Sequence, residues 1–395
     1  QIVTGTLLAK GLDVVDLGIV PTPTVLFNVK ELNANGGIVI TASHNPNEWN
    51  ALKLLNSSGQ FMSPDEHQIM KKYLDKKSSY KYWDKIGKQT VFTEGLKNHI
   101  DAILAMPLID VDRIRKKKFK VVADCVNGAG AYCIPDFLRL FGCEVIEHNC
   151  EKTGIFPRLP EPITENLLET TKAVKDTKAD FAIVVDPDVD RLVLITDTCE
   201  PFGEENTITQ VVKFILSKTP GNVAVNLSTT RAVEDVASEF ECKVYRAPVG
   251  EANVVKKMKE VDAIIGGEGS GGVIYPKLVY GRDALVGIAF TLQHLAEENC
   301  KLSELKEKLP KYFIAKKKID LVNISPDKII EKLKTKYASE KINTEDGVRI
   351  DFSDHWVHFR KSNTEPIIRI ITEAKEKTEA ERLSENYFEE IKKLF

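Results

Sequence analysis

Four short polar segments carry the residue types in this chain that could do chemistry. They are Thr41–Pro46, Asp186–Arg191, Gly267–Gly272 and Arg360–Pro366, the last followed by Arg369. In chain order they supply a loop hydroxyl, three carboxylates, a glycine-rich loop with an acceptor and a donor, and two guanidinium groups among further donors. A nucleophilic hydroxyl, a cation site, a hydroxyl-binding loop and an oxyanion clamp are the parts needed to move a phosphoryl group on a sugar.

The hydroxyl of the first segment belongs to Ser43, which follows the apolar run Gly37–Thr41. Pro46 disfavours helical geometry at Asn45, so we expect an open loop. An exposed loop hydroxyl can carry a phosphoryl group, although a serine or asparagine here could equally cap a helix or a turn. Lys53, ten residues further on, could hold a phosphate, move a proton or simply be an exposed lysine.

The second segment places Asp186, Asp188 and Asp190 in alternation directly after an apolar run. Alternation predicts three side chains on one side of an extended loop, where the carboxylates would repel each other unless a divalent cation lay between them. Ligands that are all oxygen favour magnesium over zinc. An EF-hand does not fit, because Arg191 and Asp197 stand where a glycine and a glutamate are needed. A solvated acidic loop is the remaining alternative.

The third and fourth segments are suited to binding hydroxyls and anions. Glu268 and Ser270 offer an acceptor and a donor, although glycines here could also mark a plain turn. The segment is not a P-loop, because the lysine and the following hydroxyl are missing. In the fourth segment arginine forks and loop donors match phosphate oxygens, and a hairpin turn with surface arginines is the alternative. These donors are Arg360, Ser362, Asn363, Thr364 and Arg369.

Length and composition exclude several classes of protein. With 395 residues, the chain is too long for one ordinary core, and we expect three or four domains. The 43% hydrophobic and 29% charged residues, with no apolar run long enough for a membrane span, predict a soluble globular protein. The net charge of -3 argues against nucleic acid as a partner. Seven cysteines without a CxxC pair support neither a zinc nor a redox site and favour a reducing, cytoplasmic compartment.

The elements that must position the four segments follow a strand–loop–helix rhythm. Alternating buried strands and helices predict α/β layers, which bind ligands at the carboxyl ends of their strands. Residues 2–10 are typical of the end of a helix and 14–17 of a strand, so we expect a piece of the first domain to precede residue 1. The predicted strands that precede candidate loops are Gly37–Thr41, Lys120–Ala123, Phe181–Val185, Asn222–Leu227 and Ala263–Ile265.

The character of the chain changes after Leu309. Strands are predicted at Arg349–Phe352 and His355–Phe359, before a final amphipathic helix. This order predicts a separate C-terminal α+β domain. The apolar positions of the helix are Ala380, Leu383, Tyr387, Ile391 and Leu394.

Taken together, the TASHNP, DPDVDR and RKSNTEP segments and the glycine-rich loop resemble the α-D-phosphohexomutase superfamily along essentially the whole chain. This superfamily contains phosphoglucomutases, phosphomannomutases and phosphoglucosamine mutases. Residues 271–276 and 281–283 look more like archaeal-type members. The resemblance implies three related α/β domains, with mixed sheets flanked by helices, and a C-terminal α+β domain around a central cleft. The domain boundaries predicted here are 1–90, 91–200, 201–310 and 311–395.

The resemblance also implies an activity: a cytoplasmic isomerase of carbohydrate metabolism, monomeric or dimeric, that interconverts hexose 1-phosphates and 6-phosphates through a phosphoserine and a 1,6-bisphosphate. Ser43 would be the phosphoserine and, with the three aspartates, a Mg²⁺ ligand. His44, Lys53 and Arg191 would be catalytic. The substrate contacts would be Glu268, Ser270, Arg360, Ser362, Asn363, Thr364 and Arg369.

Two features leave room for other interpretations. The family's usual N-terminal glycine-rich segment with an arginine is not in this sequence, and Gly272 stands where histidine is common. A haloacid-dehalogenase-type phosphatase would use Asp186 as nucleophile and Asp188 as acid, but it leaves Ser43 and Arg360 unexplained. A sugar-phosphate sensor would bind without turnover. Replacing Ser43 with alanine separates the three hypotheses.

Overall fold

The computed structural model describes residues 1–76, 79–321, 325–361 and 367–393. The chain forms two compact units, and each is built from more than one stretch of sequence. Unit 1 comprises Gln1–Glu204 and Gly272–Ser303, and unit 2 comprises Glu205–Gly271 and Glu304–Phe395. Within the described residues, no helix has the length and apolar character needed to cross a membrane.

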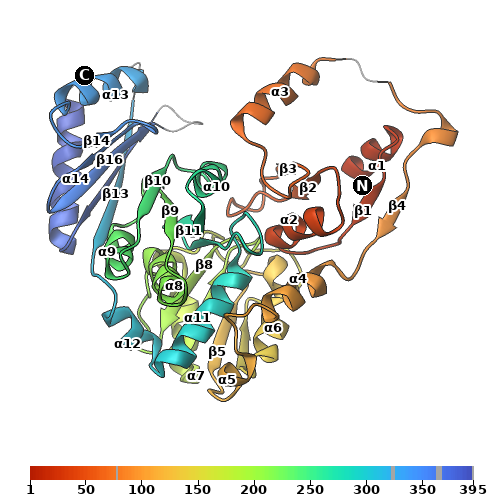
Figure 1. The fold of residues 1–395 in the computed structure, drawn as a ribbon, viewed down its shortest axis with the longest axis horizontal. Helices are drawn as coiled ribbons and strands as arrows, with labels where there is room; N and C mark the ends of the chain where they lie inside the picture. The colour runs from red at the N-terminus through yellow and green to blue at the C-terminus, as the bar shows by residue number, and fades with distance from the viewer. Residues whose placement is uncertain (77–78, 322–324, 362–366, 394–395) are drawn as a thin grey trace. The chain divides into compact units, whose positions relative to one another are not determined.

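Unit 1 begins with two small two-stranded sheets, one parallel (β1 with β4) and one antiparallel (β2 with β3) (Figure 1). The antiparallel pair matters for the site, because its connection carries Ser43. The elements are α1 (Ile2–Ala9), β1 (Val14–Asp16), α2 (Thr22–Glu31), β2 (Gly37–Ile40), β3 (Leu52–Leu55), α3 (Pro64–Leu74) and β4 (Gln89–Val91).

The larger sheet of unit 1 has the strand order β6-β5-β7-β8. The first three strands are parallel and β8 runs antiparallel to β7. Every residue of β7 and β8 is buried, as expected for apolar strands covered on both faces. The elements are α4 (Gly95–Leu104), α5 (Val111–Arg115), β5 (Lys120–Asp124), α6 (Ile134–Leu140), β6 (Glu144–His148), α7 (Leu168–Thr177), β7 (Phe181–Val185), β8 (Leu192–Thr196), β12 (Gly272–Ile274) and α11 (Ala284–Glu298).

Unit 2 contains a second parallel sheet, in which β9 lies between β10 and β11. This sheet has the same parallel arrangement as the β6-β5-β7 part of unit 1, as the related α/β domains implied by the family resemblance would have. The elements are α8 (Glu204–Lys218), β9 (Asn222–Asn226), α9 (Ala232–Glu239), β10 (Val244–Ala247), α10 (Glu251–Glu260), β11 (Ala263–Glu268) and α12 (Leu302–Glu307).

The C-terminal part of unit 2 is an antiparallel sheet of order β13-β17-β16-β15-β14. Its apolar residues share one core with α13 and α14, which are labelled near the sheet in Figure 1. Ala380, Leu383, Tyr387 and Ile391 are buried in this core, as predicted, and Leu394 lies outside the described residues. The elements are β13 (Phe313–Asp320), α13 (Pro326–Lys336), β14 (Ile342–Asn343), β15 (Val348–Asp351), β16 (His355–Lys361), β17 (Ile367–Ala374) and α14 (Lys377–Lys392).

The predicted fold class is therefore confirmed: α/β layers with mixed sheets flanked by helices, followed by an α+β domain. The strands expected before the candidate loops all form, with ends that shift by up to three residues. The physical reason is that continuous apolar runs of four to six residues bounded by polar loops are stable mainly as buried strands.

Candidate active site

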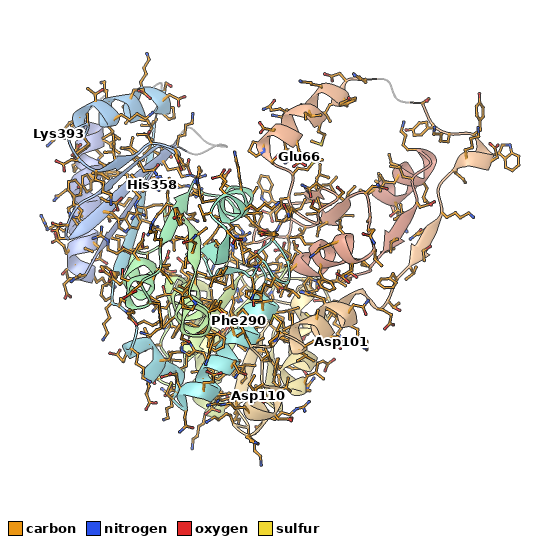
Figure 2. The ribbon with its side chains drawn as sticks, in the orientation of Figure 1. Glu66, Asp101, Asp110, Phe290, His358 and Lys393 are labelled. Atoms are coloured by element: carbon orange, nitrogen blue, oxygen red, sulfur yellow. The ribbon has the colours of Figure 1, made fainter. Side chains whose placement is uncertain are left out.

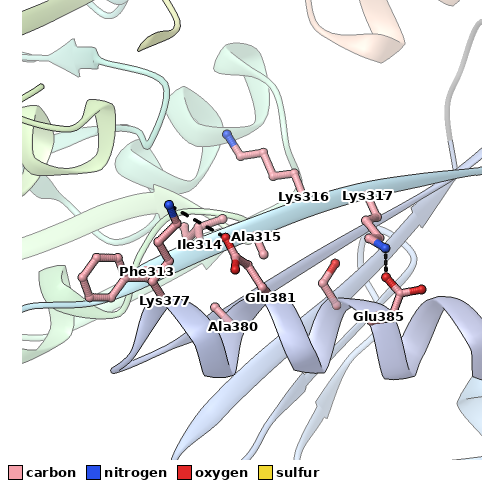
Figure 3. A pocket seen from close by; sticks show the side chains of 10 residues that line it. Phe313, Ile314, Ala315, Lys316, Lys317, Lys377, Ala380, Glu381 and Glu385 are labelled. Atoms are coloured by element: carbon pink, nitrogen blue, oxygen red, sulfur yellow. Dashed lines mark hydrogen bonds and ion pairs between the residues drawn. The ribbon is translucent and has the colours of Figure 1, made fainter. Parts of the chain in front are cut away.

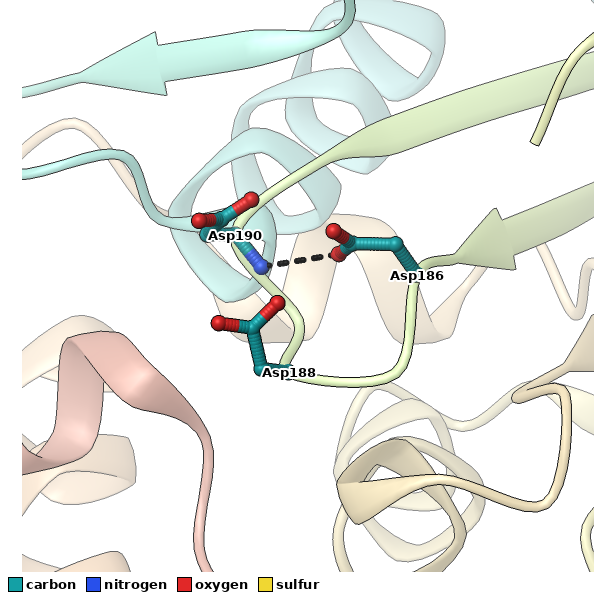
Figure 4. A group of neighbouring side chains, drawn as sticks. All are labelled: Asp186, Asp188 and Asp190. Atoms are coloured by element: carbon teal, nitrogen blue, oxygen red, sulfur yellow. Dashed lines mark hydrogen bonds between the residues drawn. The ribbon is translucent and has the colours of Figure 1, made fainter. Parts of the chain in front are cut away.

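The three aspartates lie in the connection between β7 and β8, in unit 1 (Figure 4). The prediction of an extended loop is wrong, because the segment folds back as a turn. The backbone N–H groups of Asp190 and Arg191 both donate to Oδ1 of Asp186, at 3.1 Å each. Val189 takes a left-handed conformation, with φ of 62°. The turn, rather than alternation along a strand, brings one oxygen from each aspartate within 4.8 Å of the others.

All three carboxylates are buried, with exposures of 0%, 4% and 0%. One oxygen of each has no hydrogen-bond partner among the described residues: Oδ2 of Asp186, Oδ1 of Asp188 and Oδ1 of Asp190. Burial, followed by the charges of Asp190 and Asp188, raises the pKa of Asp186 well above its usual range. Three orphaned, closely spaced oxygens are a donor set that a small hard cation such as Mg²⁺ fits.

Two cations from other elements already face these carboxylates. Nζ of Lys53, on β3, lies 2.6 Å from Oδ2 of Asp188 and 2.9 Å from Oδ2 of Asp190. Nη2 of Arg282, from the segment between β12 and α11, lies 2.8 Å from the same Asp190 oxygen. Burial alone would raise the pKa of Asp190, but the charges of Arg282 and Lys53 outweigh it and hold that pKa well below its usual range. Asp190 is therefore ionised.

Lys53 is held as an ammonium ion. Burial would lower its pKa, yet the charges of Asp190 and Asp188 raise it above the ordinary value. While these contacts last, Lys53 can act as an acid or as a counter-charge but not as a base.

The start of α2 holds the turn from another side. Oγ1 of Thr22 donates to Oδ2 of Asp188 at 2.6 Å, and its backbone N–H donates to the carbonyl of Asp188 at 2.9 Å. Thr22 was not predicted from the sequence, and Arg282 was included only in the range 281–283 that resembles archaeal-type members. Neither residue type predicts a site, since threonine and arginine are common on surfaces and the pairing depends on contacts more than ninety residues apart.

Ser43 lies in the connection between β2 and β3, also in unit 1. Its φ of 52° is uncommon for a residue with a side chain, and such conformations cluster at functional sites. The backbone N–H of Ser43 donates to Oγ1 of Thr41 at 2.9 Å, and Nδ2 of Asn45 donates to the carbonyl of Ala42 at 2.8 Å. These two bonds fix the loop and leave the Ser43 hydroxyl half-exposed, within 3.2 Å of Nδ1 of His44.

His44 connects this loop to the aspartate turn. Its Nε2 lies 3.9 Å from Oε1 of Glu161, which lies 3.7 Å from Nη1 of Arg191. Burial and then the charge of Arg191 lower the pKa of His44, so its ring is neutral near pH 7. Nε of Arg191 is buried and has no partner in the described part of the chain. Sequence reasoning missed Glu161, whose Pro-Glu-Pro setting is typical of an ordinary turn.

Unit 2 holds the residues predicted to bind the sugar. Glu268 ends β11, is 5% exposed, and accepts from Nδ2 of Asn226 at 3.0 Å and from the N–H of Gly250 at 3.1 Å. Ser270 is half-buried in the turn after it. A Cβ at Gly269 would lie 2.0 Å from Oε1 of Glu205, so any side chain there would require the Glu205 carboxylate to move. The Glu205 carboxylate therefore lies close against the turn.

The two arginines predicted to bind phosphate stand opposite each other on β16 and β17, in register as Arg360 and Arg369. Directly opposed residues point to the same face of a sheet, and two like charges there destabilise it unless an anion or acid intervenes. Asp346 supplies an acid, with Oδ2 2.7 Å from Nε of Arg360. Three further predicted donors, Ser362, Asn363 and Thr364, lie outside the described residues.

A separate groove of about 370 Å³ lies between β13 and α14 (Figure 3). Its polar lining consists mainly of lysines and glutamates, with ion pairs such as Lys317 to Glu385. It contains none of the predicted site residues.

Family models of the description phosphoglucomutase/phosphomannomutase match along the chain. The α/β/α domain I matches residues 1–81, domain II matches 97–199, domain III matches 205–313 and the C-terminal domain matches 297–390. Together these matches cover most of the chain.

Individual proteins with similar sequences or structures carry related names. A probable phosphoglucosamine mutase of Methanopyrus kandleri is 34% identical over 98% of this chain and 85% of its own length. A phosphoglucomutase/phosphomannomutase of Thermococcus kodakarensis is 37% identical over 95% of this chain and 82% of its own. The crystal structure of a putative phosphomannomutase from Thermus thermophilus superposes with a TM-score of 0.82 at 25% identity, covering 98% and 85% of the two chains.

Proposed function

Because the chain belongs to the phosphoglucomutase/phosphomannomutase family of the α-D-phosphohexomutase superfamily, we propose that Ser43 carries the phosphoryl group that it exchanges with hexose phosphates. The protein is a phosphohexomutase, an isomerase that interconverts hexose 1-phosphates and 6-phosphates. The observation that most strongly supports the residue assignment lies in unit 1. There, Ser43 has an uncommon positive φ, and one oxygen of each of the three aspartates is buried without a hydrogen-bond partner among the described residues. The two loops interact electrostatically, because the charges of Arg191 and Asp190 act on His44.

In the forward half-reaction, the bond from Ser43 Oγ to phosphorus breaks and a bond from a sugar hydroxyl oxygen to phosphorus forms. We assign to Lys53, which is held as an ammonium ion, the proton that goes to the departing Oγ, and the proton lost by the sugar hydroxyl then restores that ammonium. The buried, unpartnered Nε of Arg191 is a donor for a phosphate oxygen. Neutral His44, 3.2 Å from Oγ, orients the hydroxyl. The hexose 1,6-bisphosphate then returns its other phosphate to Ser43.

Asp186, Asp188 and Asp190 are the residues that would hold Mg²⁺, with Ser43 or its phosphate as a further ligand. When bound, the ion would neutralise charge on the transferred group. Without it, Lys53 and Arg282 balance two of the three carboxylates.

For the substrate, we propose that Glu268 and Ser270 bind adjacent sugar hydroxyls and that Arg360 and Arg369 bind the phosphate that is not being transferred. The buried Glu268 oxygen is held by two donors, which prepares the carboxylate to accept from paired hydroxyls. Ser362, Asn363 and Thr364 join this proposal from the sequence alone. The relatives' names differ in the sugar, so glucose, mannose and glucosamine phosphates are all to be tested.

We also propose the four domain boundaries predicted from the sequence, a monomeric or dimeric state and a cytoplasmic location. All seven cysteines are free thiols, which agrees with a reducing compartment.

The test is mass spectrometry of the Ser43 peptide, since a phosphoryl group adds about 80 Da. Protein charged with glucose 1,6-bisphosphate should carry this mass on Ser43 and lose it to glucose 1-phosphate when Mg²⁺ is present. The variant Ser43→Ala should lose turnover and still bind sugar phosphate, whereas Ser57→Ala, at an exposed loop serine, should behave as the native chain. Turnover by Ser43→Ala at the native rate would refute the phosphoserine.

A further inference from the structure

A chain of hydrogen bonds in unit 2 joins the sugar-binding carboxylate to the phosphate-binding arginine. It begins at Glu268, which accepts from Nδ2 of Asn226. Oδ1 of Asn226 accepts from the backbone N–H of Ser228 at 2.8 Å, and Oγ of Ser228 lies 2.9 Å from Nδ1 of His358. His358, labelled in Figure 2, lies on β16 two residues before Arg360.

The chain continues from His358 to Asp346. Nε2 of His358 lies 2.6 Å from the carbonyl oxygen of Asp346, so Nε2 must carry the proton that it donates. Burial, the largest effect, lowers the pKa of His358 to about 4, so the ring is neutral near pH 7. Nδ1 therefore accepts from the Ser228 hydroxyl. The histidine therefore has a single tautomer, with the proton on Nε2. It accepts a hydrogen bond from the segment after β9 and donates one to the turn before β15.

A second route closes the ring through the loop before α10. The backbone N–H of Val249 donates to Oδ2 of Asp346 at 3.0 Å, and the N–H of the next residue, Gly250, donates to Oε1 of Glu268. Gly250 has φ of 119°, a conformation that only glycine adopts easily. Two consecutive amides thus bind the two carboxylates, one each.

Asp346 is where both routes meet Arg360. The same Oδ2 that accepts from Val249 lies 2.7 Å from Nε of Arg360. Nε is on the inner edge of the guanidinium, so this contact does not use the two terminal nitrogens, which can form a fork with a phosphate. Both side chains are shielded, with exposures of 20% for Asp346 and 18% for Arg360, so a charge-assisted bond here holds the arginine in one orientation.

We propose that Asp346 is a positioning residue that fixes the guanidinium of Arg360 relative to Glu268, so that one substrate is held at its phosphate and at its hydroxyls together. The inference rests on the proposed substrate roles of Glu268 and Arg360. Its physical basis is that binding is tighter when the binding side chains are already ordered in the free protein. Otherwise part of the binding free energy is lost to the entropy of ordering them.

The test is a double-mutant cycle with the full-length chain and glucose 1-phosphate as substrate. Asp346→Asn is expected to raise KM about tenfold, the loss typical of one charge-assisted hydrogen bond, with a smaller change in kcat. Arg360→Gln is expected to raise KM at least as much. In the double variant the second change should add no more than about twofold, because both changes remove one interaction. Inorganic phosphate, tested as a competitive inhibitor, should weaken in parallel.

Controls separate positioning from folding. Glu345→Gln changes an exposed carboxylate one residue away and should leave KM and kcat at native values. Asp346→Glu keeps the charge but moves it by one methylene, and it should give a KM between those of native protein and Asp346→Asn. Should Asp346→Asn fold poorly by its thermal midpoint, the Asp346→Glu variant carries the same cycle.

The outcomes are distinct. Fully additive effects of Asp346→Asn and Arg360→Gln, or an Asp346→Asn variant that behaves like Glu345→Gln, would overturn the inference while leaving the mutase function intact. An Arg360→Gln variant with native KM and native phosphate inhibition would instead remove the proposed substrate role of Arg360, and with it the premise.

Discussion

At the scale of single residues, Gly272 and Arg282 explain one departure from the family pattern. A Cβ at position 272 would lie 2.4 Å from Cδ of Arg282, so a side chain there would displace the arginine. Arg282 in turn bonds to Asp190. The absence of a side chain at 272 therefore makes room for a cation beside the aspartate turn. The sequence alone indicated only that the histidine common in the family is missing at position 272.

His358 should make the stability of unit 2 sensitive to acid. Its pKa is about 4 in the folded chain and near 6.5 when exposed, so between these values the unfolded chain binds the extra proton. The contribution of the neutral ring to the free energy of unfolding should therefore be fully present above about pH 6.5. It should fall by about 1.4 kcal/mol per pH unit as the pH drops from there toward 4. Asp346, Arg349 and Arg360 are the charged groups that act on the ring.

The variant His358→Gln cannot take up this proton, so its unfolding free energy should depend less steeply on pH between 6.5 and 4. Urea titrations followed by tryptophan fluorescence would measure this, because Trp356 is fully buried in unit 2 whereas Trp49 and Trp83 are already exposed in the folded chain. His67→Gln, at an exposed histidine of α3, is the matched control and should keep the native slope. An unchanged slope in His358→Gln would mean that His358 is not buried as a neutral ring.

At the scale of elements, the end of α7 offers a test of local conformation. Lys178 caps this helix with φ of 53°, and its N–H bonds back to the carbonyls of Val174 and Lys175. The left-handed conformation costs about 1 kcal/mol in steric strain for residues with a side chain, whereas glycine adopts it without this cost. We expect Lys178→Gly to stabilise the protein by up to about 1 kcal/mol. Lys172→Gly, at an exposed position inside the same helix, should destabilise it by about 1 kcal/mol.

Both values come from denaturant midpoints at constant m. Equal destabilisation by the two glycines would show that Lys178 does not adopt the left-handed conformation, since only that conformation reverses the sign.

The elements also show what the sequence could predict. The strands that begin at Phe181 and Ala263 were predictable, because short apolar runs bounded by polar loops favour buried strands, although the second strand runs three residues past its predicted end at Ile265. The shape of the aspartate turn was not, because it depends on two N–H groups bonding to the side chain of Asp186. Nor was the contact of Asp346 with Val249, since nothing local to either residue indicates a partner 97 positions away.

At the scale of the whole molecule, the sequence order and the compact units differ. Residues 272–303 fall within the range that matches family domain III, yet they pack in unit 1, where α11 contacts α4 and α5. This return of the chain carries Arg282 to the aspartate turn. No periodicity in the sequence shows where a chain returns to an earlier unit, so Arg282 could not be assigned before the structure.

Because the aspartate turn joins several distant parts of unit 1, cation binding there should stabilise the unit as a whole. Thr22 reaches it from α2, Lys53 from β3 and Arg282 from the segment before α11. A ligand that binds only the folded state adds about 2.7 kcal/mol at a hundredfold excess over its Kd. We therefore expect Mg²⁺ to raise the thermal midpoint of chelator-treated protein by a few degrees.

The rise should disappear in Asp188→Asn, which removes one of the three charges that a cation would neutralise, and it should persist in Asp112→Asn, at a carboxylate that is 80% exposed. Differential scanning calorimetry over a Mg²⁺ series gives the midpoint, and the change with concentration gives the affinity. If Asp188→Asn responded to Mg²⁺ as the native chain does, the ion would bind elsewhere. The three orphaned oxygens would then need another partner, and the ammonium of Lys53, 2.6 Å from the other carboxylate oxygen of Asp188, is one candidate.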